Sequence, residues 1–507
     1  MQILETKNHF NCQEFEDFLI EEVYLENVLV KVNEIWFRYL LDGEEIDCSV
    51  KYDSISLEDT NLASPAGVKC FAVVIAVLFS LRFSSVLPQK FDFSKYSQFI
   101  DRELLNFLQT TIPKCWSENR YQVGKLVYQS PEIKVNESLL GQDVTYPIFE
   151  LKTEQNTVDV IIGSGSGKDS LLCSLILQKA GVNYDILTCL YNSYGNIEEQ
   201  KELFTQTSEH LNYRKQHYIY FQDSYYPWLQ QRFDRYNIVA RTQEYFEYKK
   251  PFHNIAGENI ILPFLLAPIQ AIHKITLLLV GNEKSADAPN LIDKYSGETV
   301  AHQWVKSLEA NEKIEDQMAR MFNNIHHASL IKPIHDVKIF DLVFKLGDQL
   351  PYATNSCNIQ KPWCCRCEKC CYVFAGFCAY GDREKVIKAF GKDLFAMEEN
   401  LYIWSELLGL KGYIPWECVG MPEETQLYFY KVYQQGVRNQ AIAERGVSCI
   451  ALFEQEILTP LQNSGKSVEN YFQQIQNQFG QVYENHHTMP EWLWQKISPV
   501  LRNSSQQ

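Results

Sequence analysis

The chain lacks an excess of basic residues, and this absence limits what it is expected to bind. Its 507 residues include 47 lysines and arginines against 63 aspartates and glutamates, which gives a formal net charge of -16. A chain this negative repels the phosphates of nucleic acids and of anionic membranes. We therefore expect no nucleic-acid partner, a tRNA included, unless a local basic patch overrides the total charge.

The chain also lacks the patterns of a secreted or membrane-inserted protein. Its first seven residues show no basic start followed by an apolar stretch, so we expect no signal peptide. The richest apolar run, residues 70–81, is too short to span a bilayer and predicts a buried helix. Residues 260–281 are apolar too, but two prolines, a histidine and a lysine interrupt them, so they predict a buried helix and then a strand. We expect a cytoplasmic protein without membrane insertion.

The 15 cysteines are not spread as they are in a secreted disulfide protein, because six of them lie between residues 357 and 371. In a chain of this size without a signal peptide, that concentration favours metal binding in a reducing cytoplasm. Four of the six follow the pattern C-x6-C-x2-C-x2-C, which lets four thiolates close a tetrahedral Zn²⁺ shell. The predicted ligands are Cys357, Cys364, Cys367 and Cys370, with Cys365 and Cys371 as additional thiols.

Two alternatives for the cysteine cluster stay open at the level of sequence. The same C-x2-C-x2-C core occurs in iron–sulfur proteins, so a metal is better indicated than its identity. A group of free thiols or disulfides is the other alternative. A zinc ion held by four thiolates would have no open coordination position and would therefore be structural.

A glycine-rich loop in the middle of the chain carries the strongest functional signal. An apolar, β-branched run at 158–162 leads into Gly163, Gly165 and Gly167, and a helical pattern follows from Leu171. Such glycines let backbone amides converge on an anion at the positive end of the next helix, and a phosphate is the natural ligand. The Walker A pattern almost fits, but its first glycine is displaced by one residue. Asp169 also stands where that pattern needs a magnesium-binding hydroxyl.

The loop resembles instead the pyrophosphate loop, S-G-G-x-D-S, of ATP pyrophosphatases. These enzymes split ATP into AMP and pyrophosphate and leave AMP on an oxygen of the substrate. The loop opens with Gly-Ser-Gly rather than Ser-Gly-Gly. The resemblance implies that Lys168 offsets the phosphate charge and that Asp169 helps to hold Mg²⁺. The residues expected to bind ATP are Gly165, Ser166, Gly167, Lys168, Asp169 and Ser170.

Around the loop, the pattern predicts an α/β fold. A strand, the loop, a helix that Gly181 would cap and a second strand at 184–191 make a βαβ unit, whose ligands bind beyond the carboxyl ends of the strands. That places the loop and the turn at 192–195 on one rim. Two alternating runs on either side of Asp42-Gly43 predict a β-hairpin near the start of the chain, where nothing points to chemistry.

The length predicts more than one domain. Residues 1–150 are expected to form a small α+β domain. Residues 151–400 are expected to form a parallel-sheet domain of the PP-loop ATP pyrophosphatase type with the zinc-binding segment. Residues 401–507 are expected to be helical, with a disordered end at 503–507.

A pyrophosphate loop followed by a late four-cysteine site resembles the 7-cyano-7-deazaguanine synthase superfamily. Within that superfamily, four segments are most similar to the UDP-N-acetylmuramoyl-L-alanyl-L-glutamate epimerase family, and the resemblance covers roughly residues 150–425. The four segments are 282–286, 302–307, 363–374 and 416–420.

This resemblance implies an ATP-dependent inversion of the terminal L-glutamate of a nucleotide-sugar dipeptide, a step in peptidoglycan precursor synthesis. Adenylating the α-carboxylate would make the adjacent Cα proton easier to remove; reprotonation from the other face and hydrolysis would complete the reaction. His302, Glu283 and Lys284 are candidates for proton transfer by chemistry and by the resemblance. Cys418 is a further candidate, because a thiol can accept and return a proton.

Two other functions stay open at this stage. A ligase of the same superfamily would adenylate a carboxylate on a deazapurine or a protein and then transfer nitrogen to it. A zinc-stabilised nucleotide-binding protein would keep the fold without turnover, which the altered opening of the loop permits.

Overall fold

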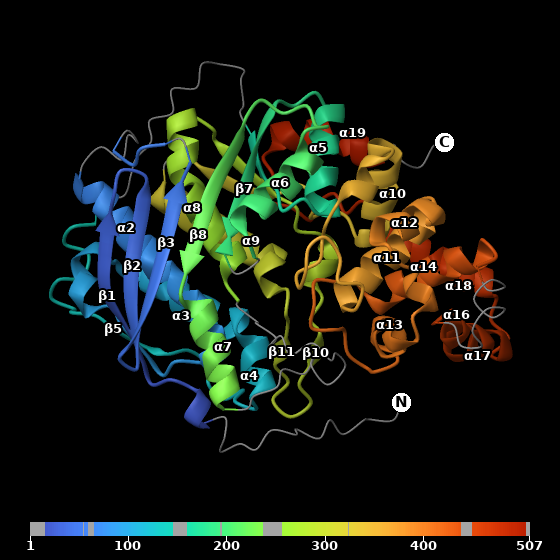
Figure 1. Cartoon of the computed structure of the whole chain (residues 1–507), viewed down its shortest axis with the longest axis horizontal. Coiled ribbons are helices and arrows are strands. Elements are labelled where there is room, and N and C mark those ends of the chain that lie inside the picture. The colour runs from blue at the N-terminus through green and yellow to red at the C-terminus, as the bar shows by residue number, and fades with distance from the viewer. Residues whose placement is uncertain are drawn as a thin grey trace.

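One large sheet forms the centre of the molecule in the computed structural model, which describes residues 16–53, 55–58, 65–144, 160–192, 195–236, 256–322, 324–437 and 449–502. Within these ranges, ten strands pair in the order β12-β9-β6-β7-β8-β3-β2-β1-β4-β5 (Figure 1). The strands of the sheet are β1 Glu22–Val30, β2 Glu34–Leu41, β3 Glu44–Tyr52, β4 Lys90–Asp92, β5 Glu132–Lys134, β6 Val160–Gly163, β7 Tyr184–Tyr191, β8 Gln216–Asp223, β9 Leu277–Val280 and β12 His326–Ser329. A separate short ribbon pairs β10 Leu291–Ile292 with β11 Thr299–Val300.

Helices cover both faces of the sheet and form a second body beside it, at the right of Figure 1. They are α2 Pro65–Phe79, α3 Arg102–Cys115, α4 Ser117–Gln122, α5 Lys168–Lys179, α6 Ile197–Ser208, α7 Tyr225–Arg235, α8 Glu258–His273, α9 Leu308–Met321, α10 Asp336–Gly347, α11 Glu368–Tyr380, α12 Arg383–Phe390, α13 Leu401–Leu407, α14 Pro422–Gln434, α16 Cys449–Phe453, α17 Thr459–Asn463, α18 Val468–Phe479 and α19 Glu491–Arg502. The shorter helical turns are Ser80–Val86, Ser94–Phe99, η5 Lys284–Asp287, η6 Trp304–Lys306, Leu350–Ala353, Leu394–Ala396, Glu398–Asn400 and Glu454–Leu458.

Strands β12, β9, β6, β7 and β8 pair in parallel, which confirms the α/β prediction and the βαβ unit. Alternate side chains of β6 enter different cores, as the period of two requires. Ile161 belongs to the core that α2 and α8 also fill, whereas Val160 and Ile162 belong to the core of α5, α10 and α19. Because both faces of these strands are buried, they read as apolar runs rather than as alternating ones.

The predicted hairpin is present, and its strands belong to the central sheet. β2 and β3 pair antiparallel on either side of the Asp42-Gly43 turn. β3 then pairs antiparallel with β8, so the strands from the start of the chain extend the parallel half of the sheet. The expected boundary near residue 150 lies outside the described residues, and the three-domain division stays a prediction.

Other local predictions are confirmed. The apolar run at 70–81 is buried in and just after α2, and Gly181 follows α5 with a positive φ of 65°. Among the described residues, one segment, 67–86, is long and apolar enough to cross a membrane. However, 89% of its most apolar window is buried within the fold, as in a core helix. Helix α5 begins at Lys168, three residues before the predicted start.

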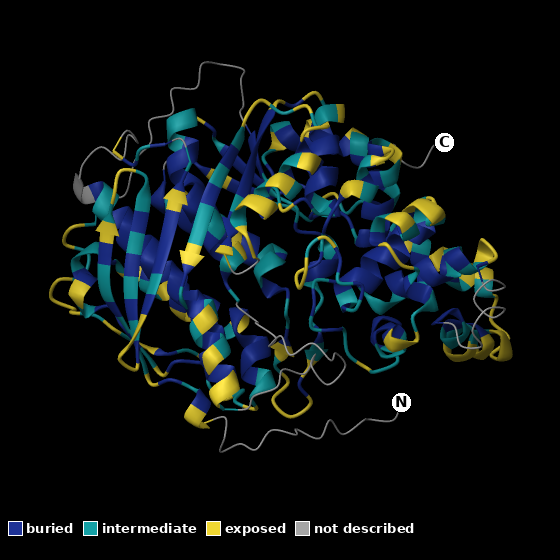
Figure 2. Ribbon diagram, in the orientation of Figure 1, coloured by how far each residue is buried: buried dark blue, intermediate teal, exposed yellow. Residues whose placement is uncertain are grey.

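A third core lies in the helical body. It is built on α11 and α14 and contains many aromatic side chains. Cys357, Cys367 and Cys370 belong to it, and Cys364 packs against it. Figure 2 shows this region as predominantly buried. The carboxyl-terminal part is helical as predicted, through α14 to α19, while residues 503–507 lie outside the described ranges.

Candidate active site

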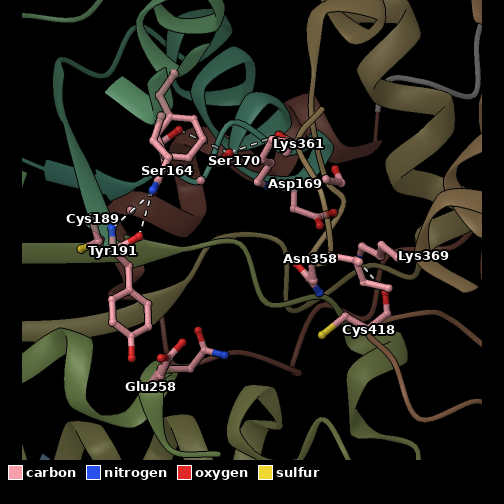
Figure 3. Close-up of a pocket in the computed structure, with 18 of the residues that line it drawn as sticks. Ser164, Asp169, Ser170, Cys189, Tyr191, Glu258, Asn358, Lys361, Lys369 and Cys418 are labelled. Carbon is pink, nitrogen blue, oxygen red and sulfur yellow. Dashed lines mark hydrogen bonds between the residues drawn. The ribbon is translucent and has the colours of Figure 1, made fainter. Parts of the chain in front are cut away.

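A cavity of about 1370 Å³, lined by both polar and apolar residues, opens at the carboxyl ends of the parallel strands, where this architecture binds its ligands. Gly163 ends β6, Asn192 follows β7 and Gly281 follows β9, and all three line the cavity. The predicted rim is therefore confirmed for Asn192 and Gly195, whereas residues 193 and 194 lie outside the described ranges. Figure 3 shows Asp169, Lys369 and Cys418 on one side of the cavity and Tyr191 with Glu258 on the other.

The glycine-rich loop is held in place by residues that come much later in the chain. The amide of Asn355 donates to the carbonyl of Ser166 at 3.0 Å, and the amide of Lys168 lies 3.4 Å from Oγ of Ser356. A Cβ atom on Gly167 would stand 3.0 Å from the same Oγ, so the close approach favours glycine. Ser166 has a φ of 56°, a left-handed conformation that glycine adopts without strain. The glycine of the family pattern that is replaced here therefore falls on a position whose backbone favours glycine.

The structure separates the predicted loop residues into two groups. Gly165, Gly167, Asp169 and Ser170 line the cavity. Lys168, in contrast, is 1% exposed and is not part of the cavity wall, and Ser166 is buried too.

The buried ammonium of Lys168 bridges two carboxylates. Its Nζ lies 2.5 Å from Oδ1 of Asp169 and 2.5 Å from Oδ1 of Asp336, which is 1% exposed at the start of α10. Tyr372 donates to the other oxygen of Asp336 at 3.1 Å. The lysine thus ties the loop to the helical body, and only Asp169 of the three charged groups faces the cavity.

Two predicted acid–base candidates after β9 lie away from the cavity wall. Glu283 is 2% exposed, and its Oε2 has no hydrogen-bond partner among the described residues. Burial would raise the pKa of Glu283, but three lysine charges hold it well below its usual range; they belong to Lys306, Lys168 and Lys369. The ammonium of Lys284 points to the ring of Tyr483, 4.6 Å from its centroid, and does not reach the cavity.

The other two candidates, His302 and Cys418, meet at the cavity wall. Nε2 of His302 lies 3.9 Å from Sγ of Cys418, and Nδ1 of the same ring lies 2.6 Å from Oε2 of Glu118. The carboxylate side chain is 3% exposed and the imidazole 15% exposed. A carboxylate, an imidazole and a thiol therefore form one line of hydrogen-bonding groups, of which the imidazole and the thiol reach the cavity.

The charges around this line favour a thiolate and an imidazolium. Burial would raise the pKa of Cys418, but the Lys306 ammonium and the hydrogen bond with His302 hold it below the usual thiol value. Burial would lower the pKa of His302, but the Glu118 carboxylate and the Cys418 sulfur hold it well above its usual value. The site therefore favours the thiolate of Cys418 more than an exposed cysteine would, and a thiolate can act as a base.

Two amide side chains hold the His302 and Cys418 segments together by hydrogen bonds to backbone groups. Asn290 accepts from the amide of His302 at 2.7 Å and donates through Nδ2 to the carbonyls of Ile414 and Pro415, at 3.0 and 2.7 Å. Gln303 donates to the carbonyl of Val419 at 2.9 Å. The positions of the imidazole and the thiol are therefore fixed by side-chain amides on both sides of the pair.

The four predicted metal ligands converge, because their sulfur atoms all lie within 4.8 Å of one another. The Cys357–Cys367 sulfur distance is 3.9 Å and the Cys364–Cys370 distance is 3.7 Å, too long for disulfides. Four thiolates about 2.3 Å from one Zn²⁺ would lie roughly 3.8 Å apart, so the sulfur set fits a single tetrahedral ion. The two additional thiols stand apart from this set: Cys365 donates to the Phe390 carbonyl at 3.4 Å, and Cys371 is buried in α11.

Several residues of the site were not predicted as site residues. Glu118 lies in the part of the chain where the sequence showed no chemistry, and Asp336 lies in no recognised motif. Lys361 and Lys369 line the cavity, and their places beside the cysteine pattern were the available signal. Lys306 lies within a segment that carried the family resemblance, but it had no assigned role.

Comparison with known proteins adds to this geometry. Residues 351–451 match the family model of the MurL C-terminal domain. This segment holds the four-cysteine cluster and Cys418. The resemblance was expected to end near residue 425, and this expected limit is wrong because the match continues to residue 451.

Three relatives carry the name UDP-N-acetyl-alpha-D-muramoyl-L-alanyl-L-glutamate epimerase. The protein from Micromonospora sp. is 31% identical over 171 residues, which is 30% of this chain and 36% of the relative. The Salinispora tropica protein is 32% identical over 156 residues, 29% of this chain and 34% of the relative. The Xanthomonas oryzae pv. oryzae protein is 23% identical over 252 residues, 45% and 52% of the two chains. The matched part of the chain spans about a third to a half of these relatives, and over that part both comparisons support the epimerase family.

Proposed function

We propose that this chain is an ATP-dependent epimerase that inverts the terminal L-glutamate of UDP-N-acetylmuramoyl-L-alanyl-L-glutamate in the cytoplasm. The observation that carries the proposal is that one cavity holds both the phosphate-loop residues Asp169 and Ser170 and the Cys418–His302 pair. An epimerase of this kind needs an activating site and a proton-transfer site within reach of one glutamyl group. The names of the three relatives support the choice of substrate.

Activation falls to the loop in this proposal. The loop amides at the start of α5 would face the phosphates of ATP, and Asp169, whose side chain is 22% exposed at the cavity wall, would be a carboxylate ligand for Mg²⁺. Mg²⁺ would offset phosphate charge there. Transfer of AMP to the α-carboxylate replaces an anion by an electron-poor acyl group, so the Cα proton becomes more acidic.

Proton removal falls to Cys418. Its thiolate, stabilised by Lys306 and His302, would accept the Cα proton of the activated glutamate. Delivery of a proton to the opposite face of Cα inverts the centre, and water then cleaves the acyl–AMP bond. The balance is one ATP and one water consumed for one AMP, one pyrophosphate and one inverted glutamate.

The size of the cavity supports a large substrate, and lysines in its wall offer contacts for anionic groups. Its volume of about 1370 Å³ exceeds the roughly 300–1,000 Å³ of a site for one drug-sized ligand. Three lysines line it, namely Lys306, Lys361 and Lys369. Six carboxylates also line the cavity, so the three ammonium groups would serve as local contacts for the diphosphate of a nucleotide sugar rather than make the whole cavity positive; they are Asp169, Glu199, Glu202, Glu258, Glu368 and Glu417.

The cysteine cluster would serve as a structural zinc site in this enzyme. The four thiolates leave no open position for chemistry. The segment they enclose carries Lys361 and leads into Lys369, so a bound ion would fix the lysine-bearing wall of the cavity.

The test is to incubate the purified chain with ATP, Mg²⁺ and one candidate carboxylate at a time, measuring pyrophosphate and the configuration of glutamate. The nucleotide-sugar dipeptide should give both pyrophosphate and D-glutamate. Pyrophosphate with a deazapurine carboxylic acid alone would establish the ligase instead. Pyrophosphate with none of the substrates would favour a nucleotide-binding protein without turnover.

A further inference from the structure

Glu118 belongs to the amino-terminal part of the chain, yet its carboxylate is buried against His302, which lines the cavity. The residue is 2% exposed, and its Oε2 lies 2.6 Å from Nδ1 of His302. Its other oxygen accepts from Nε2 of Gln122 at 2.6 Å. Both carboxylate oxygens therefore have a partner, and the side chain is held in one orientation.

Helix α4, which carries Glu118, is anchored to both segments of the Cys418–His302 pair. Arg120, fully buried, forms an ion pair with Glu298, and Ser117 Oγ accepts from the amide of Ala301 at 3.2 Å. The ring of Tyr121 lies 5.6 Å from that of Trp416, two residues before the thiol. The helix thus contacts the chain next to His302 and next to Cys418.

We propose that Glu118 is a positioning residue that holds the imidazole of His302 with Nε2 toward the sulfur of Cys418. The inference deepens the proposed function, on which it rests, by adding a third member to its proton-transfer site. A carboxylate at Nδ1 fixes which ring nitrogen carries the proton and orients the ring. The thiol proton can then pass to Nε2, leaving a thiolate on Cys418 and an imidazolium that Glu118 neutralises.

Other charged groups face this chain of three residues and must be considered with it. Lys306 faces Cys418 from η6, Lys369 donates to the Cys418 carbonyl from α11, and Glu417 precedes the thiol. Glu368 faces His302. Of the carboxylates near the pair in the described part of the chain, Glu118 is the one hydrogen-bonded to the imidazole, at 2.6 Å, which distinguishes its role from a general effect of charge.

The test measures the thiol itself, so it does not depend on turnover. The full-length Glu118→Gln variant is alkylated with iodoacetamide across roughly pH 5 to 10, and the peptide that holds Cys418 is quantified by mass spectrometry. Glu118→Asp tests rescue by a retained charge. Glu298→Gln is the matched control, because it makes the same change in a carboxylate that binds α4 through Arg120 without touching His302. Thermal unfolding of each variant checks the fold.

We expect alkylation of Cys418 at neutral pH to fall about tenfold in Glu118→Gln, as for a shift of one pKa unit. Glu118→Asp should recover part of the loss, and Glu298→Gln should match the wild type. An unchanged profile in a folded Glu118→Gln protein overturns the inference. His302, Glu417 and Cys418 also have ligand atoms within 4.8 Å of one another. If the wild type binds two zinc ions and the Glu118→Gln variant binds one, these three residues are metal ligands and the inference is overturned as well. A shifted profile in a protein without epimerase activity would retain the role of Glu118 and refute the proposed function.

Discussion

The imidazole of His302 lies 3.9 Å from the sulfur of Cys418, although 116 positions separate them in the sequence. The amides of Asn290 and Gln303 bridge the two segments and bring the pair to the cavity. In the proposed reaction, this thiol–imidazole pair would carry proton transfer and the loop would carry activation. The two half-reactions should therefore be separable by mutation.

Replacing Cys418 by serine should abolish inversion and leave pyrophosphate release. A hydroxyl has nearly the same size but is a far weaker acid, so it provides no base at neutral pH. The measurement is the ratio of D-glutamate to pyrophosphate formed with the nucleotide-sugar dipeptide. Cys189→Ser is the control, since Cys189 also lines the cavity and is not hydrogen-bonded to His302. Inversion at the wild-type rate in Cys418→Ser would remove the thiol from the mechanism.

Replacing Lys306 by glutamine should move the pH dependence of inversion upward. The Lys306 charge favours the thiolate, so its removal raises the pKa of Cys418 and the base forms only at higher pH. The rising limb of the pH–rate profile should shift by about one unit. Lys361→Gln removes another cavity lysine that does not face the thiol and should leave the limb in place. A downward shift in Lys306→Gln would contradict the assignment.

Asp169→Asn should abolish pyrophosphate release without unfolding the protein. The carboxylate lines the cavity and is the expected Mg²⁺ ligand, whereas the amide carries no charge. Pyrophosphate formation and the melting temperature are measured on the same sample. Glu199→Gln makes the equivalent change elsewhere in the cavity wall and should retain activity. Wild-type turnover of Asp169→Asn would exclude it from activation.

Cys367→Ser should lower zinc content and stability together, because the proposed ion would link the separate segments that carry its four ligands. Metal analysis and thermal unfolding test this. Cys371→Ser changes a neighbouring buried thiol outside the set of four and should keep the metal. If Cys367→Ser binds as much zinc as the wild type, the ligand set is wrong. If the purified protein contains iron instead of zinc, the four cysteines form an iron site.

Asp336→Asn should destabilise the fold rather than act first on chemistry. Asp336 and Lys168 form a buried pair at 2.5 Å, and removing one charge of such a pair costs on the order of 3 kcal/mol of unfolding free energy. Asp341→Asn, on the same helix, breaks the more exposed pair with Lys345 and should cost about 0.5 kcal/mol or less. Chemical denaturation of both variants gives the comparison. Equal losses of unfolding free energy would mean that the buried pair stabilises the fold no more than the exposed pair does.

Local sequence patterns predicted the elements that position the site. They could not predict which segments far apart in the sequence pair with one another. The strand at 184–191 has the predicted bounds, and Gly181 caps α5, because short-range periodicity and turn chemistry decide both. The joining of β3 to β8 depends on tertiary packing between segments far apart in sequence. Glu118 was missed for the same reason, since one glutamate in a short helix gives no signal until the fold brings it to His302.

Lys168 illustrates a different limit. The sequence placed it in the loop, three residues before the expected start of the helix, whereas it is the first residue of α5. Pattern alone also does not say where a long side chain points. In the structure its ammonium is directed to Asp336 in the interior rather than into the cavity. Its expected role in offsetting phosphate charge therefore stays a prediction.

In the proposed reaction, activation by ATP and proton exchange at Cα are coupled in this cavity, so that each inversion requires one activation. The most direct test runs the reaction with the nucleotide-sugar dipeptide, ATP and Mg²⁺ in D2O and follows deuterium at Cα of the terminal glutamate together with pyrophosphate. We expect D-glutamate carrying deuterium at Cα, with one pyrophosphate released for each inversion. Pyrophosphate release with unlabelled L-glutamate, or inversion in the absence of ATP, would contradict it.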